Sequence, residues 1–239
     1  MVAYSDGRST TRDSAGFLDD YAYTAIACLD AYEATSDITY FRTAQKVTDQ
    51  MIERFYDSGS GGFFDSQSPK QELGVLAAKR KPFQDSPMPA GNPVAASALT
   101  RLHAYTNESS YREKAEKTLE LLAGVAARYG IFAASYGLAA AAISVPHIQI
   151  VIVGEDQVAT ELCTRALAAR QIGKSVLKFT FSQTVESNLP PSLAVTIPNL
   201  PAVKQKRTSA IVCSGTACQP SVHTVEELDQ LLREENPAA

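Results

Sequence analysis

The chain is poor in cysteine, with only four among its 239 residues: Cys28, Cys163, Cys213 and Cys218. Thiols so few and so scattered do not form a disulfide framework, and in a reducing compartment we expect them to stay reduced. The gap between Cys213 and Cys218 fits neither a C-x-x-C redox pair nor a zinc knuckle, even with His223 nearby. We therefore expect buried structural thiols, no metal site and no cofactor.

A strong charge of either sign is also absent, since the formal net charge is −4 at pH 7. Without a basic surface the chain has no field to attract phosphate groups, so nucleic acid and anionic membranes are not expected partners. Small neutral or cationic ligands are not excluded by this charge.

Long hydrophobic runs are missing as well. The longest, from Ile131 to Val145, is interrupted by polar and glycine residues and falls short of the roughly 20 residues that a spanning helix needs. We expect a buried helix there and no membrane contact. The first eight residues have no basic segment leading into an apolar run, so we expect no secretory signal and a cytoplasmic protein.

Familiar catalytic patterns are missing too. His103 and His147 are isolated, and no Ser/His/Asp order predicts a nucleophilic triad. The run from Ile148 to Gly154, with the helix expected after it, looks like a nucleotide-binding unit, but one glycine stands where G-x-G-x-x-G needs three. Packing within a small domain explains this unit adequately.

What the sequence does contain is helical periodicity. Apolar residues recur at steps of three and four, which predicts helices with one buried face each. Four segments show this spacing: residues 17–32, 41–55, 93–105 and 111–125. The connections are short, so we expect two antiparallel hairpins. Seven large residues should be buried between them: Leu18, Leu29, Phe41, Phe55, Leu99, Leu102 and Leu122.

The two hairpins resemble each other in sequence, because Leu29-Asp30-Ala31-Tyr32 matches Leu102-His103-Ala104-Tyr105. Repeated helix pairs are typical of solenoids and of closed toroids. The loop from Asp57 to Gly91 separates the hairpins, and long loops at one end of a toroid usually build a cleft. A ligand site is therefore expected near this loop.

After Pro146 the pattern changes to that of a small α/β unit. The expected elements are strands at 148–153, 176–181 and 210–213 and helices at 157–170 and 225–233.

Four segments occur in a particular order: 16–22 (GFLDDYA), 61–65 (GGFFD), 85–92 (DSPMPAGN) and 212–218 (VCSGTAC). In this order they resemble the C-terminal third of the thioredoxin-domain-containing proteins related to spermatogenesis-associated protein 20. The resemblance extends from Asp6 to Leu232. It implies a six-hairpin, glycosidase-like toroid, similar in shape to N-acylglucosamine 2-epimerases and carried behind a thioredoxin-like domain.

The expected fold is therefore mainly α: a partial (α/α)6 toroid of helical hairpins at residues 1–143, followed by a small α/β region at 144–239. The thioredoxin-like domain and the first hairpins of the family do not precede this region, so their redox chemistry is not carried over. An open arc exposes apolar edges, and we expect these to be covered in a homo-oligomer or by the missing N-terminal portion.

Asp19 and Asp20 are the candidate catalytic residues. They open the first helix, where carboxylates of toroidal glycosidases face the cleft as general acid or base. Acidic residues in a first turn also simply complement the helix dipole. Adjacent residues diverge by about 100° around a helix, so at most one of the two would be catalytic.

Five further residues are candidates for binding a substrate: Tyr21, Phe63, Asp65, Asp85 and Asn92. Aromatic rings could stack on a sugar and carboxylates could bind its hydroxyl groups, while free N–H groups at the next helix start would add a polar rim. The plainer alternative is that the phenylalanines fasten a Gly-Gly turn, Asn92 caps a helix, and the basic residues 79–81 are solvated.

Two functions remain open. One is a carbohydrate-active or sugar-epimerase-like protein with a small carbohydrate ligand and cleft carboxylates, as the resemblance implies. The other is a non-catalytic scaffold or binding module, a fragment of a larger thioredoxin-domain-containing protein, which the missing helices favour.

Overall fold

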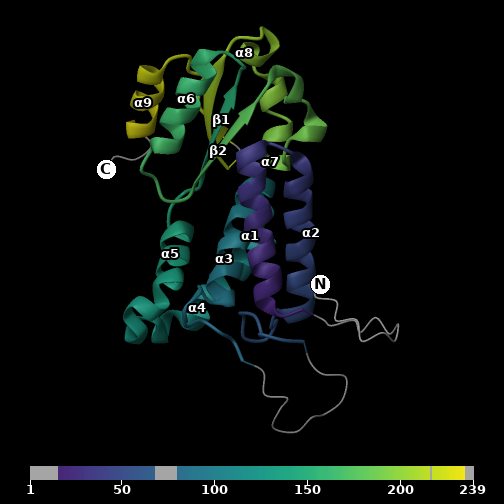
Figure 1. The fold of residues 1–239 in the computed structure, drawn as a ribbon, viewed down its shortest axis with the longest axis vertical. Coiled ribbons are helices and arrows are strands. Elements are labelled where there is room, and N and C mark those ends of the chain that lie inside the picture. The colour runs from purple at the N-terminus through teal and green to yellow at the C-terminus, as the bar shows by residue number, and fades with distance from the viewer. Residues whose placement is uncertain (1–15, 68–79, 216, 235–239) are drawn as a thin grey trace.

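The computed structural model describes residues 16–67, 80–215 and 217–234. Within them, helices come first and a mixed α/β unit follows (Figure 1). The first part contains α1 (Leu18–Thr35), α2 (Ile38–Phe55), α3 (Gly91–Thr106), α4 (Ser109–Ala126), the 3-10 segment η2 (Ala127–Ala133) and α5 (Ala134–Ile143). The second part contains β1 (Ile148–Val153), α6 (Gln157–Ala168), β2 (Lys174–Phe179), α7 (Pro191–Ala194), α8 (Pro201–Lys204), β3 (Ser209–Ser214), β4 (Ala217–Cys218) and α9 (Val225–Glu234), with short 3-10 turns between β2 and α8.

The four helices expected in the first part are present. α1 packs along α2, α3 packs along α4, and α1 also packs against α3 (Figure 1). All seven residues expected in the core are buried. The equivalent tyrosines of the internal repeat, Tyr32 and Tyr105, meet edge to face with their ring centroids 5.6 Å apart.

Local chemistry decides where these helices start and stop. The Asp37 carboxylate accepts a hydrogen bond from Thr39 N (2.9 Å) and so caps α2. α1 ends at Ser36 and α3 at Asn107, both in the left-handed region with φ near 57° and 59°. The connections are therefore short, and each helix turns back along the one before it.

The sheet is mixed, with the strand order β2-β1-β3-β4. β1 is parallel to β2 and antiparallel to β3. β2 begins at Lys174, earlier than the expected 176, because its limits follow its pairing with Ile148 of β1 rather than its own hydrophobicity. β4 was not expected, since a strand of two residues has no periodicity to read.

The two faces of the sheet bury different sets of side chains, as strand alternation requires. Ile148, Ile150 and Ile152 of β1 pack with α6 and α9. Val151 and Val153 lie in the same buried cluster as the residues of the helical hairpins. The helical hairpins therefore share a core with one face of the sheet, and α6 and α9 cover the other face.

Hydrogen bonds fix the C-terminal ends of α1 and α3 against the sheet. Gln149 Nε2 donates to Ala104 O (2.6 Å), and Ser36 Oγ donates to Lys178 O (2.7 Å). The N-terminal ends of both helices consequently lie at the other end of the molecule (Figure 1).

The prediction of a buried helix over Ile131 to Val145 is wrong. Ile131 is 82% exposed and Leu138 is 73% exposed. The apolar composition predicted burial, but α5 packs mainly along α3 and its outer face stays open among the described residues. By length and composition alone, Ser109–Ile143 could cross a membrane. A kink at Gly130 (φ 52°, ψ −125°) divides this segment.

The prediction of thiols at Cys213 and Cys218 is also wrong, because the structure joins them in a disulfide. The two residues stand opposite each other in the β3–β4 ladder. Their spacing in sequence fits neither a C-x-x-C redox pair nor a zinc knuckle, and the β3–β4 hairpin brings them together. Cys28 and Cys163 are free.

Candidate functional site

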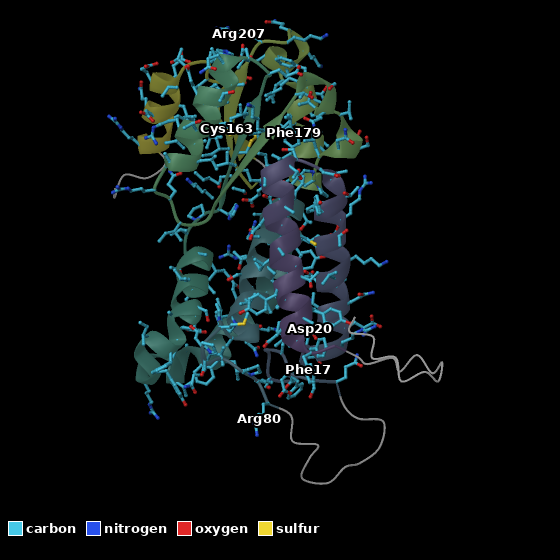
Figure 2. The ribbon with its side chains drawn as sticks, in the orientation of Figure 1. Phe17, Asp20, Arg80, Cys163, Phe179 and Arg207 are labelled. Atoms are coloured by element: carbon cyan, nitrogen blue, oxygen red, sulfur yellow. A yellow bond between two sulfur atoms is a disulfide. The ribbon has the colours of Figure 1, made fainter. Side chains whose placement is uncertain are left out.

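One end of the helical part collects the candidate site residues. The N-terminal ends of α1 and α3 meet there with the loop segments 56–67 and 80–90. Leu18 N donates to Asp65 O (3.0 Å), which joins the first loop to the start of α1. Figure 2 shows Asp20 at this end.

Asp19 is the carboxyl best suited to acid chemistry. Its side chain is accessible to solvent, yet partial burial raises its pKa, and the charges of Asp20 and Asp65 raise it further. Its Oδ1 lies against the backbone of Gly91, where any Cβ would overlap it. Glycine at position 91 therefore lets α1 and α3 approach this closely.

Asp20 has a local structural role. Its Oδ2 accepts a hydrogen bond from Phe17 N (2.8 Å), which satisfies an N–H group at the start of α1. A carboxylate in the first turn also complements the helix dipole. The side chains of Asp19 and Asp20 thus point in different directions, as adjacent positions on a helix require.

Asp65 is half-buried beside the start of α1. Its Oδ1 accepts hydrogen bonds from Ser66 Oγ (3.1 Å) and, at the long limit, from Arg80 N (3.4 Å). The charge of Asp65 contributes to the raised pKa of Asp19. The two carboxyl groups therefore share one electrostatic environment.

Tyr21 is partly enclosed by its neighbours. Its ring meets Phe55 edge to face, with centroids 5.3 Å apart, and the Arg54 guanidinium lies over it at 5.5 Å. The ring is thus already engaged with protein groups on two sides.

Tyr23 belongs to the site although it was not among the candidates. Its hydroxyl donates to Pro89 O (2.7 Å), and burial together with the charges of Asp19 and Asp85 raises its pKa. Asp19 and Tyr23 are four residues apart on α1, so they share one face of the helix. That spacing was the signal that could have identified Tyr23.

Asn92 of α3 is hydrogen-bonded to the loop at Phe63, and both side chains are buried, so neither is accessible to a ligand. Asn92 Oδ1 accepts from Phe63 N (2.7 Å), and Asn92 Nδ2 donates to Phe63 O and to Pro82 O (2.9 Å each). The interpretation of Asn92 as a helix cap is wrong, because the N-cap of α3 is Ala90. Phe63 does not fit the expected stacking platform, since its ring is fully buried.

Asp85 joins α3 to α5. Its carboxylate accepts hydrogen bonds from Ala90 N (2.9 Å), from Ser135 N (2.9 Å) and from Ser135 Oγ. Burial alone would raise the pKa of Asp85, but these hydrogen bonds lower it below its ordinary value. A carboxyl held ionised in this way is unsuited to donating a proton.

Lys81 differs from the solvated residue expected at this position. Its Nζ pairs with Asp57 Oδ2 (2.8 Å) and lies 4.9 Å from the centre of the Phe64 ring. The hydrogen bond from Lys81, with others from Ser60 and a backbone N–H, holds the pKa of Asp57 well below its usual range. Lys79 lies outside the described residues.

The side chains of Asp19, Asp65 and Tyr23 present carboxylate and hydroxyl oxygen atoms. Within the described ranges, no group of three His, Cys, Asp or Glu side chains could hold a metal ion. Two cavities of about 840 and 460 Å³ in the α/β unit include neither Asp19 nor Asp65. The candidate site is therefore the surface around Asp19, Asp65 and Tyr23.

Comparison with known proteins gives no matching family model. Spermatogenesis-associated protein 20 of Homo sapiens is 29% identical over 91% of this chain, which corresponds to 27% of the human protein. The Mus musculus protein of the same name is 36% identical over 41% of this chain and 12% of its own length. An uncharacterised Caenorhabditis elegans protein is 23% identical over 90% of this chain and 28% of its own length. The chain is homologous to spermatogenesis-associated protein 20 and spans about a quarter of the human relative.

Proposed function

We propose that the chain binds small carbohydrates at the surface formed by Asp19, Asp65 and Tyr23, with Asp19 as the general acid or base of a glycosidase-like or epimerase-like reaction. The observation that supports this is the raised pKa of Asp19, whose carboxyl is accessible to solvent yet partly shielded from it. A raised pKa keeps a carboxyl protonated closer to neutral pH, as proton donation requires.

The three residues have separate roles in this proposal. Asp19 exchanges a proton with the sugar, while Asp65 accepts a hydrogen bond from a sugar hydroxyl group. The Tyr23 hydroxyl donates to Pro89 O, so its oxygen has lone pairs left to accept a hydrogen bond from the ligand. The site is open, so we expect weak binding that exchanges quickly.

A non-catalytic scaffold is the second candidate function, and a specific observation favours it. Asp20, Phe63, Asp85 and Asn92 all have structural partners, so only part of the expected site is available to a ligand. If the chain is a scaffold, replacing the Asp19 carboxyl should change no ligand-dependent property.

The wider architecture belongs to the same proposal. We place the helices, up to residue 143, in an arc of a six-hairpin toroid and the α/β unit from residue 144 beside it, in a cytoplasmic protein. The two packed hairpins and their matching sequences support this placement.

A thermal-shift screen over monosaccharides and disaccharides tests the ligand, because a molecule that binds only the folded state raises Tm. At millimolar sugar we expect a higher Tm for the wild type and for Glu53→Gln, a matched control that removes an exposed acid on α2. We expect no increase for Asp19→Asn. If no sugar raises Tm, or if Asp19→Asn responds like the wild type, the proposal fails and the scaffold is favoured.

A further inference from the structure

A cavity in the α/β unit lies away from the surface around Asp19. It is an open depression of about 460 Å³, and Cys218, Arg207, His223 and Gln205 are among its lining residues. Figure 2 shows Arg207 at the opposite end of the molecule from Asp20. Chemistry in this cavity would therefore be independent of the proposed carbohydrate site.

The disulfide at this cavity is expected to stabilise the fold only at the low end of the usual range for a disulfide. Cys213 and Cys218 are already paired across β3 and β4, and Gln219 N donates to Val212 O (2.8 Å) beside them. The stabilisation expected from a cross-link grows with the length of the loop that it closes, and this loop is very short. A structural role therefore does not explain the pair well.

The two sulfur-bearing residues differ in accessibility. Cys213 is 1% exposed and belongs to the core shared by the sheet and the helices. Cys218 is partly exposed and lines the cavity. An incoming thiolate therefore meets Cys218 first, and Cys213 becomes the leaving group.

The cavity also carries groups that favour a thiolate. Arg207, a permanent cation, is one of the lining residues, and it also acts on the Glu227 carboxylate. A cation stabilises a thiolate over a thiol when the two come close. His223 Nδ1 lies 2.8 Å from Thr208 O. Because a carbonyl oxygen accepts, Nδ1 carries the hydrogen and Nε2 is the acceptor nitrogen of the neutral ring.

We propose that Cys213–Cys218 is a redox-active disulfide that exchanges with small dithiols entering this cavity. The dithiol loses a proton to solvent or to His223, and its thiolate attacks the sulfur of Cys218. A mixed disulfide forms, the bond to Cys213 breaks, and the Cys213 thiolate takes up a proton. The second thiol of the dithiol then loses its proton and displaces Cys218, which leaves as a thiolate and is protonated in turn. The dithiol is oxidised by two electrons and the cysteine pair is reduced.

The test follows the cysteine pair in the native full chain. The protein is purified without reductant, treated with dithiothreitol at pH 7, and quenched at intervals with iodoacetamide before mass spectrometry of the peptides. We expect residues 213 and 218 to become alkylated within minutes while circular dichroism stays native, and to reoxidise on addition of a small disulfide. Cys28→Ser and Cys163→Ser, which remove the free cysteines, should leave this behaviour unchanged.

A second comparison tests the role of the cavity. Arg207→Gln should slow reduction about 3- to 10-fold at low salt, because it removes the charge that stabilises the attacking thiolate. Lys204→Gln removes an exposed charge of α8 and should not slow reduction. The proposal is overturned if the pair is already reduced on purification, if it is reduced only after denaturation, if reduction unfolds the chain, or if the two charge variants behave alike.

Discussion

The Asp19 carboxylate lies against the bare backbone of Gly91, so that a methyl group on residue 91 would overlap both Asp19 Oδ1 and the side chain of Leu18. Gly91→Ala should therefore displace the Asp19 carboxylate and the buried Leu18 side chain, and lower the free energy of unfolding by about 1 to 3 kcal/mol. Gly124 of α4 is the matched control, because nothing lies within 4 Å of its added Cβ. Gly124→Ala should stabilise by up to about 1 kcal/mol through helix propensity. Urea denaturation compares the two, and equal effects would contradict the close approach.

The equivalent tyrosines of the repeat should respond in opposite ways to loss of the hydroxyl. Tyr32 is fully buried, and its hydroxyl has no hydrogen-bond partner among the described residues, so Tyr32→Phe should be neutral or stabilising. The Tyr105 hydroxyl donates to Glu33 Oε1 (2.8 Å). Tyr105→Phe should lower stability by about 1 to 2 kcal/mol, since it leaves a charged acceptor with one partner fewer. Thermal or urea unfolding checks the pair, and a clear loss of stability in Tyr32→Phe would contradict this account.

Stability should rise with pH between about 4 and 6.5 because of His147. Burial, with the charges of Arg101 and His103, lowers the pKa of His147 from 6.5 to about 4 in the folded chain. Its ring bonds Ser175 Oγ at 2.8 Å. Below pH 6.5 the unfolded chain binds the extra proton first, so the stability present above that pH is lost as the pH falls toward 4. The loss is at most about 3 kcal/mol.

The measurement is urea denaturation at pH 7 and pH 5, for the wild type and for His147→Gln. The difference in stability between the two pH values should shrink in the variant. An unchanged difference would show that other groups cause the pH dependence.

The outer face of α5 and the end of α4 should pair with a second copy of the chain. This face exposes a group of large apolar residues: Leu121, Val125, Tyr129, Ile131, Phe132 and Leu138. From Leu121 to Gly154 the sequence has no acidic residue, although the chain as a whole has a net charge of −4. Arg128 is the one charged Lys, Arg, Asp or Glu side chain of this stretch, and an apolar face complements itself across a two-fold axis.

Light scattering after size exclusion tests this association. Leu138→Glu should shift the wild-type oligomer to monomer, because it places a charge in the apolar face. Leu167→Glu is the control, since Leu167 is exposed on α6 of the other unit. A wild-type chain that stays monomeric at high concentration would contradict the prediction.

The helices could be predicted from the sequence because each has a single apolar face whose residues are close in the chain. Leu18, Leu29 and Phe55 follow that spacing and are buried as expected. The prediction for the α5 region was wrong for the converse reason. This helix is apolar on all sides, and composition alone does not say which side packs against a neighbour. Only the tertiary contacts decide that Ala139 is buried and Leu138 is exposed.

The end of the helices that collects the candidate residues could be predicted, but the partners of these residues could not. The sequence predicted that the long loop and the acids of α1 lie at one end of the helices, and the hydrogen bond from Leu18 N to Asp65 O places them together. The roles of Asn92 and Asp85 depend on partners far away in sequence, such as Phe63 and Ser135. The local sequence pattern alone predicts a helix cap or a polar rim at these positions. The disulfide of Cys213 likewise depends on a hairpin whose second strand is too short to predict.

The most direct test of the central claim is the pKa of the Asp19 side chain, measured from its carboxyl ¹³C resonance in a pH titration of the labelled full chain. The account predicts a midpoint above the roughly 3.9 of an aspartate in an unstructured peptide. It also predicts that Asp65→Asn lowers this midpoint, because the neighbouring negative charge is removed. A midpoint at or below the ordinary value would show that Asp19 is a plain surface carboxylate, and the role of general acid would then be contradicted.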